Sequence, residues 1–139
     1  LKIRNTTMKT LTTAFVLATL ATTPALAQAY VPNDRLTFTP TEGGVHISGS
    51  TGFGARGHWC AAADYALREM GAQDSQKLYV SEPRARGFGG DGGVTFTLDP
   101  AGLTPSPVVI LGGSLTKAGS AMTISHGITL CGGLQSPGR

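Results

Sequence analysis

Residues His58 to Gly71 read HWCAAADYALREMG, and this stretch carries the pattern of an amphipathic helix over about residues 58–70. At about 100° per residue, its apolar side chains fall within one arc of roughly 160°, and its charged side chains fall outside that arc. Asp64 and Arg68 have the i, i+4 spacing of a helical ion pair. Gly71 is placed to end the helix as a left-handed cap.

Short segments before and after this helix alternate apolar with small or polar residues, as strands with one buried face do. The predicted strands cover residues 36–39, 45–48, 78–80, 94–98, 108–111 and 122–130. Alternation favours antiparallel pairing. Segments 78–80 and 108–111 are shorter or more continuously apolar, and the second of them is a candidate for a central strand. The predicted fold class is therefore α+β, with one helix (about 58–70) packed on a mostly antiparallel sheet of five or six short strands.

The N-terminal part of the sequence has the features of a bacterial signal peptide. From Met8 onward, Lys9 forms a short basic head, an apolar run follows, and Ala25-Leu26-Ala27 is a small-x-small cleavage site. The apolar run is too short to span a bilayer, which needs about 20 residues. We therefore expect residues 1–27 to be upstream residues plus a cleaved signal peptide. Residues 28–139 would then be a single exported domain, periplasmic or secreted.

The charge balance of this domain gives no sign of a nucleic-acid partner. The full sequence has a net charge of +3, from 11 Lys and Arg against 8 Asp and Glu. Lys2, Arg4 and Lys9 all precede the domain, so residues 28–139 are formally neutral. We expect no nucleic-acid partner and no membrane span in the mature chain, but a monomer that meets a protein or cell-envelope partner. The last residues, 132–139, read as a loose tail.

Gly52 to Gly57 read GFGARG and match the G-x-G-x-x-G fingerprint of dinucleotide-binding folds. The motif follows a predicted strand and precedes the helix. That strand, however, alternates as a half-exposed strand does, and no second helix is available to continue a doubly wound sheet. We interpret the motif as a glycine-rich connecting loop, assign no cofactor, and keep nucleotide binding as an alternative.

Other short motifs lack the partners that their chemistry needs. Ser114 and Lys117 match the S-x-x-K of serine acylases, but the accompanying motifs are missing, so a turn between strands is expected. Asp91 stands among glycines without the alternating oxygen ligands of a calcium loop. The histidines show no metal-ligand spacing; they are His46, His58 and His126. We predict no metal site.

Cys60 lies near the start of the predicted helix, where the positive end of the helix dipole lowers a thiol pKa. His126 falls in the predicted last strand, with the parity of its apolar face, which also suits a hydrogen-bonded core or edge histidine. A cysteine at a helix start and a histidine in a strand resemble the cell-wall peptidases of the NlpC type. The resemblance implies a cysteine hydrolase that uses Cys60 and His126. The chain departs from that family at Trp59, where the family usually has Asp.

The export prediction favours a different role for Cys60. An exported protein with two cysteines meets an oxidising compartment, where such a pair is far more often a disulfide than two free thiols. A bridge between Cys60 and Cys131 would join the helix start to the end of the last predicted strand. Its Cα atoms should lie about 4.4 to 6.8 Å apart. Closing so long a loop would contribute roughly 4 kcal/mol to stability.

The stretch from Glu82 to Gly92, EPRARGFGGDG, is longer than most hairpin loops. Arg84, Arg86 and Phe88 are its candidate contact residues, because exposed arginine and aromatic side chains on loops are typical of recognition surfaces. Replacing them by alanine is expected to leave the melting temperature almost unchanged. The predicted function is a non-enzymatic binding or interaction module, with a protease inhibitor that presents this loop as another alternative.

Three short pieces also resemble a group of small exported bacterial proteins of unknown function. They are WCAAADYA at 59–66, EPR at 82–84 and VTFTLDP at 94–100. This resemblance is loose and implies no activity.

Overall fold

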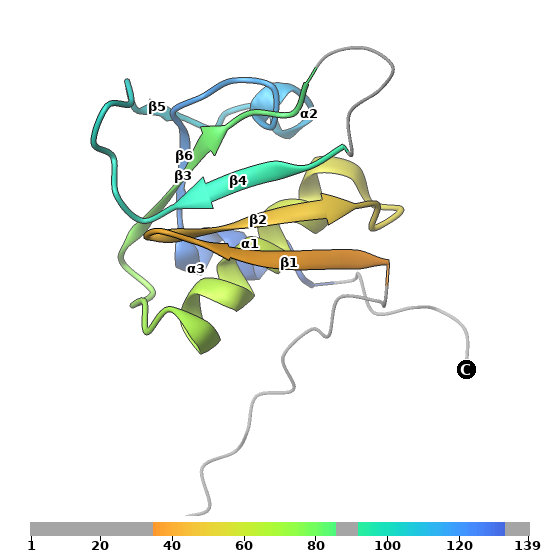
Figure 1. The fold of residues 1–139 in the computed structure, drawn as a ribbon, viewed down its shortest axis with the longest axis horizontal. Coiled ribbons are helices and arrows are strands. Elements are labelled where there is room, and N and C mark those ends of the chain that lie inside the picture. Colours follow the sequence, from red (N-terminus) through yellow and green to blue (C-terminus); the bar gives the residue numbers. More distant parts are fainter. Residues whose placement is uncertain (1–34, 86–91, 133–139) are drawn as a thin grey trace, which may run out of the picture.

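The computed structural model describes residues 35–85 and 92–132. Their elements, in chain order, are β1 (Leu36–Thr41), β2 (Gly44–Gly49), α1 (Gly54–Glu69), β3 (Lys77–Glu82), β4 (Val94–Thr97), β5 (Ser106–Pro107), α2 (Leu111–Ser114), β6 (Ser120–Thr123) and α3 (Ile124–Thr129). The six strands form one sheet in the order β1-β2-β4-β3-β6-β5 (Figure 1). β5 pairs with β6 in parallel, and the other described pairings are antiparallel. The α+β class and the mostly antiparallel sheet are confirmed.

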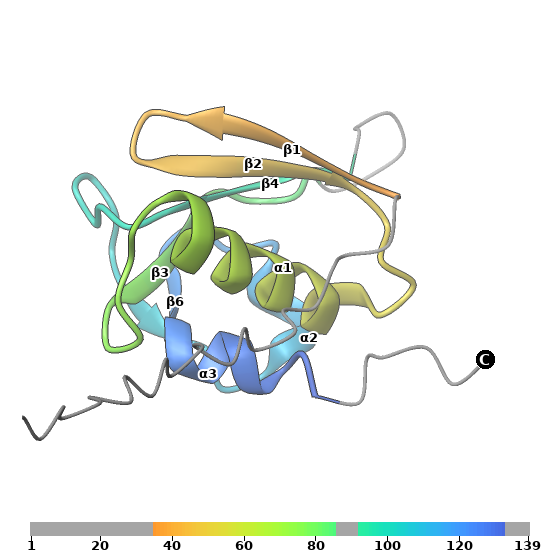
Figure 2. The ribbon, with the colours of Figure 1, turned by 90° about the horizontal axis from the view of Figure 1, so that it is seen from below.

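The described helices gather on one side of the sheet (Figure 2). The core lies between these two layers, and its largest fully buried side chains include Trp59, Phe96, Ile47 and Leu78. Val45, Ile47, Val94 and Phe96 alternate along β2 and β4 toward the helices, as the period of two requires. The intervening residues of these strands lie on the opposite face of the sheet.

Helix α1 begins at Gly54, before the predicted start, because three glycines shape the entry to it. Gly52 and Gly54 have φ angles of 74° and 57°, a region in which residues with a Cβ are strained. The Thr51 hydroxyl accepts a hydrogen bond from the Phe53 amide at 3.0 Å. A Cβ at Gly57 would collide with the Thr51 side chain. Every glycine of the G-x-G-x-x-G motif therefore has a structural role in this turn.

The predicted C-terminal half of α1 is confirmed in detail. Arg68 Nε lies 3.0 Å from Asp64 Oδ1, one helical turn away. Gly71 has a φ of 64°, and the amide of Ala72 donates to the carbonyl of Ala66 at 3.0 Å. The left-handed cap and the i, i+4 pair thus both lie where the sequence places them.

The predicted strand 122–130 is wrong beyond Thr123. β6 ends there, and the chain turns into α3, whose N-cap Thr123 accepts a hydrogen bond from the His126 amide. Gly127 allows α3 to pack closely on α1, since a Cβ there would lie 2.6 Å from the Cβ of Ala63. Packing between the two helices therefore overrides the alternating pattern of this segment.

The predicted central strand 108–111 is also wrong. The strand in this region is β5, which comes earlier in the chain and forms the edge of the sheet. Pro105 and Pro107 lack an amide hydrogen, which suits an edge strand and disfavours a central one. Beyond β5 the chain continues through Val109 and Ile110 into the short helix α2. Both side chains are exposed, so the apolar character of segment 108–111 does not reflect burial.

Candidate binding surface

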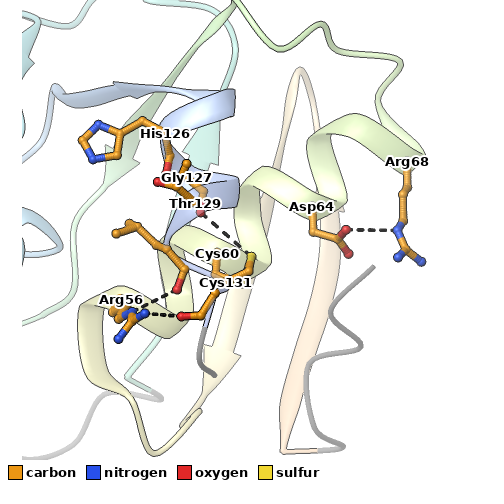
Figure 3. Close-up of a disulfide and its surroundings, with 10 residues drawn as sticks. Arg56, Cys60, Asp64, Arg68, His126, Gly127, Thr129 and Cys131 are labelled. Carbon is orange, nitrogen blue, oxygen red and sulfur yellow. Dashed lines mark hydrogen bonds and ion pairs between the residues drawn. A yellow bond between two sulfur atoms is a disulfide. The ribbon is translucent and has the colours of Figure 1, made fainter. Parts of the chain in front are cut away.

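Cys60 and Cys131 form the predicted disulfide, with their Cα atoms 5.1 Å apart (Figure 3). Cys60 comes from α1 and is fully buried, whereas Cys131 follows α3. Arg56, one turn earlier on α1, donates from Nε to the carbonyl of Leu130 at 2.9 Å and from Nη2 to the carbonyl of Gly132. The disulfide and this arginine together fasten the end of α3 to α1.

The geometry does not fit the Cys60–His126 pair that a hydrolase would need. Cys60 lies in the second turn of α1, beyond the first turn in which the helix dipole acts strongly on a thiol. Its sulfur is bonded to Cys131, so no free thiolate is available for nucleophilic attack. His126 is exposed on α3, not on the apolar face of a strand, and its ring points away from the disulfide in Figure 3.

His58 is the buried histidine of the described chain, with 1% of its surface exposed. Its Nδ1 lies 3.1 Å from the carbonyl of Gly54, so this nitrogen carries the hydrogen and donates it. Nε2 then accepts from Arg84 Nη2 at 3.2 Å. Burial lowers the pKa of His58, and the nearby positive charge of Arg84 lowers it further, whereas the Gly54 carbonyl acts in the opposite direction. His58 is held neutral.

This neutral histidine predicts loss of stability in acid. The unfolded chain binds a proton at His58 near the ordinary pKa of 6.5, whereas the folded chain resists that proton to lower pH. The melting temperature should therefore fall as the pH is lowered from about 7.5 to about 5. His58→Gln should make that fall shallower, because the group that takes up the proton is then missing. Equal slopes in wild type and His58→Gln would contradict the assignment.

Arg84, a candidate contact residue, is half-buried and engaged with the fold. Besides His58, its Nε donates to the carbonyl of Gly92 at 2.9 Å, and its amide donates to the carbonyl of Leu115 at 2.7 Å. These bonds join the two ends of the 82–92 loop and tie β3 to the residue after α2. Arg84→Ala should therefore destabilise the fold, contrary to the neutral effect expected from the sequence. Arg86, Phe88 and Asp91 lie outside the described residues.

A polar row crosses the face of the sheet opposite the helices, and sequence analysis missed it. The Thr95 hydroxyl donates to Glu82 Oε2 at 2.9 Å and accepts from His46 Nδ1 at 2.9 Å. The three residues are neighbours in register on β3, β4 and β2. Thr95 is buried, and its proton is bonded to the carboxylate, so the row stabilises the sheet and offers no exposed nucleophile. The alternation of each strand could have placed His46 and Thr95 on the polar face of the sheet. That the two residues are neighbours could not be predicted without knowing that β2 pairs with β4.

Ser114 and Lys117 are not arranged as an acylase pair. The Ser114 hydroxyl is buried, accepts from Trp59 Nε1 at 2.8 Å and donates to the carbonyl of Leu111 at 2.7 Å. Lys117 Nζ donates to the hydroxyl of Ser106 at 3.1 Å instead. Ser114 therefore anchors α2 to the core, and Lys117 lies beside β5.

Two adjacent aliphatic side chains between β5 and α2 are the most exposed large hydrophobic groups of the described residues. Val109 is 90% exposed and Ile110 is 78% exposed, against 42% for Phe53, the next of this kind. We call Val109 and Ile110 the apolar tip. Single exposed hydrophobic residues are ordinary, whereas exposed apolar side chains that adjoin one another mark contact surfaces when they form a contiguous patch.

Comparison of the chain with protein-family models, with curated proteins and with solved structures gave no match. Among residues 35–85 and 92–132, no three His, Cys, Asp or Glu side chains are grouped so as to hold a metal ion. No helix in those ranges is long and apolar enough to cross a membrane.

Proposed function

We propose that the protein is an exported, non-enzymatic binding module that contacts its partner through the apolar tip. The observation that carries this proposal is the exposure of Val109 and Ile110, which the fold itself leaves unburied. Burying a side chain of this kind against a partner is worth about 1.5–3 kcal/mol. Burial of both side chains would therefore supply a substantial part of the binding free energy, and the rest of the interface would supply the remainder.

The tip is held in place at both ends, which supports a binding role. The amide of Val108 donates to the carbonyl of Ala121 at 3.0 Å and so extends the pairing of β5 with β6. On the other side, Ser114 binds the carbonyl of Leu111 and receives the indole N–H of Trp59. Only two residues separate these anchors, so a partner meets side chains that are already positioned. Such preorganisation lowers the entropy cost of binding.

Export also supports this function. The signal-peptide pattern before residue 28 and the disulfide between Cys60 and Cys131 are both typical of proteins that act in an oxidising compartment. The disulfide occupies the cysteine that a thiol hydrolase would use, which favours binding over catalysis.

Site-specific photo-crosslinking in cells that export the protein tests this function. A benzophenone side chain at Gly112, next to the tip and exposed, should give a discrete adduct with a cell-envelope component, whether protein or lipid. The same probe in the Val109→Ser/Ile110→Ser background should lose that adduct. The probe at Thr129, an exposed position on α3, should give none.

The adduct pattern decides the proposal. An adduct that persists without the two aliphatic side chains would show that the tip is not the contact. Equal labelling from Gly112 and Thr129, or no adduct from Gly112, would remove the support for a binding module at this surface. Equal melting temperatures of the probe proteins establish that they are folded.

A further inference from the structure

The chemistry around the apolar tip narrows the class of partner. This inference rests on the proposed function and concerns the same two residues, Val109 and Ile110. Three kinds of occupant could cover them: an added β-strand, a second copy of the chain, or the apolar layer of a lipid surface. The structure bears on each of the three.

Strand addition is opposed by the edge of the sheet next to the tip. The amides of Ser106 and Val108 both donate inward, to the carbonyls of Gly119 and Ala121 on β6. The residue between them, Pro107, therefore faces the open edge, where it offers no N–H to an incoming strand. Pro105 has the same parity, so the edge lacks donors on both sides of Ser106.

A second copy is opposed by the size of the surface. A stable interface buries about 1,200 Å² or more in total, with many residues on each side. The apolar tip consists of two side chains, and its flanking residues Val108 and Leu111 are already half-buried in the fold. Two facing tips would supply only a fraction of the required area. A soft apolar phase, by contrast, can surround two projecting side chains without shape complementarity.

The charge of the surrounding segment favours a lipid surface with negative headgroups. Residues 100–132 contain no Asp or Glu, and Lys117 is their only Lys or Arg. The hydrogen bond from Lys117 to Ser106 places this ammonium group beside β5, at the base of the segment that carries the tip. Lysine next to an inserted apolar group extends its charge toward headgroups, and anionic lipids attract it.

We propose that Val109 and Ile110 insert into the interfacial layer of an anionic lipid surface, with Lys117 facing the headgroups. The protein docks on this surface without spanning it. Adjacent aliphatic side chains supply the apolar contact and the lysine supplies the electrostatic contact, the combination by which peripheral segments bind membranes. Because only one cation takes part, binding depends chiefly on the two aliphatic side chains.

Vesicle flotation of the exported form, with its first residue established by mass spectrometry, tests this proposal. Wild type should float with phosphatidylcholine vesicles that contain phosphatidylglycerol. Val109→Ser/Ile110→Ser should bind at least about tenfold more weakly, because both inserted side chains are lost. Lys117→Gln should bind about fivefold more weakly and with a weaker dependence on salt. Phe53→Ser, which removes an exposed aromatic group from the β2–α1 connection, should bind as wild type does.

The outcomes separate this inference from the proposed function. Absence of wild-type binding to the vesicles, or equal binding by the double serine variant, overturns the lipid inference. If the Gly112 photo-adduct then contains a protein, the tip is a protein-binding surface and the binding function stands. If no adduct forms either, both proposals fail. Matching circular dichroism spectra and melting temperatures exclude misfolding as the cause of any loss.

Discussion

Replacing Cys60 by alanine is expected to lower the free energy of unfolding by about 4 kcal/mol. The bridge joins residues that are 71 positions apart, so its loss frees a long loop in the unfolded chain. A domain of this size has a total stability of about 5–15 kcal/mol, of which this loss is a large share. Denaturant unfolding of wild type and Cys60→Ala, with the free energies extrapolated to water, measures the difference.

Two comparisons separate the cross-link from the side chains themselves. Cys60→Ala/Cys131→Ala should match the single variant to within about 1 kcal/mol, because either change removes the same bond. A reductant should bring wild type close to the double variant and leave the double variant unaffected. If reduction does not alter the stability of wild type, the disulfide is not what stabilises the fold.

Much of this fold could be predicted where local pattern and tertiary contacts agree. In α1 the apolar arc is buried in the core and against α3, and Gly71 ends the helix, because the same residues satisfy helix geometry and core packing. The cysteine pairing was predictable because two cysteines allow one intrachain bridge. Strands β1, β2 and β4 followed from alternation, since each has one face toward the helices. β3 followed from its short apolar run, which is buried at Leu78, Tyr79 and Val80.

The C-terminal third was predicted poorly, because its short segments depend on neighbours that are distant in the sequence. Six residues are too few to distinguish a period of 2 from one of 3.6, so α3 was mistaken for the end of a strand. The capping residue Thr123 was a local signal for that helix. Close contact between Gly127 and Ala63 on α1 then fixes α3 where it is, and no local pattern reveals that contact.

The candidate binding surface lay inside a segment that the sequence presents as core. Val108 to Leu111 are continuously apolar, which ordinarily indicates a buried strand. Whether such a run is buried depends on whether another element covers it, and here β5 forms the sheet edge. Pro105 and Pro107 were the local signal that this part of the chain lies at a sheet edge and not in a central strand. Composition singled out the 82–92 stretch as a contact loop, which stays a prediction, and it could not show that Arg84 hydrogen-bonds to Gly92 and His58.

Trp59 is expected to be the core side chain whose truncation costs most. It is fully buried, its ring meets Phe96 edge to face at a centroid distance of 5.0 Å, and its N–H donates to Ser114. Trp59→Ala should lower the free energy of unfolding by about 3–5 kcal/mol, since it leaves a large cavity between α1 and the sheet. Equilibrium denaturation measures this loss, and a loss below about 1 kcal/mol would show that the ring is not central to the core.

A change at Ser114 tests the hydrogen bond of Trp59 without removing the indole ring. The Ser114 hydroxyl accepts from the indole N–H and donates to the carbonyl of Leu111, next to the apolar tip. Ser114→Ala leaves the indole N–H buried without an acceptor and should cost about 1–3 kcal/mol. Trp59→Phe/Ser114→Ala removes both partners, so its cost should be less than the sum of the two single changes. Ser114→Ala should also weaken the Gly112 photo-adduct, because it frees one anchor of the tip. An unchanged adduct would mean that the pairing of β5 with β6 alone is enough to position Val109 and Ile110.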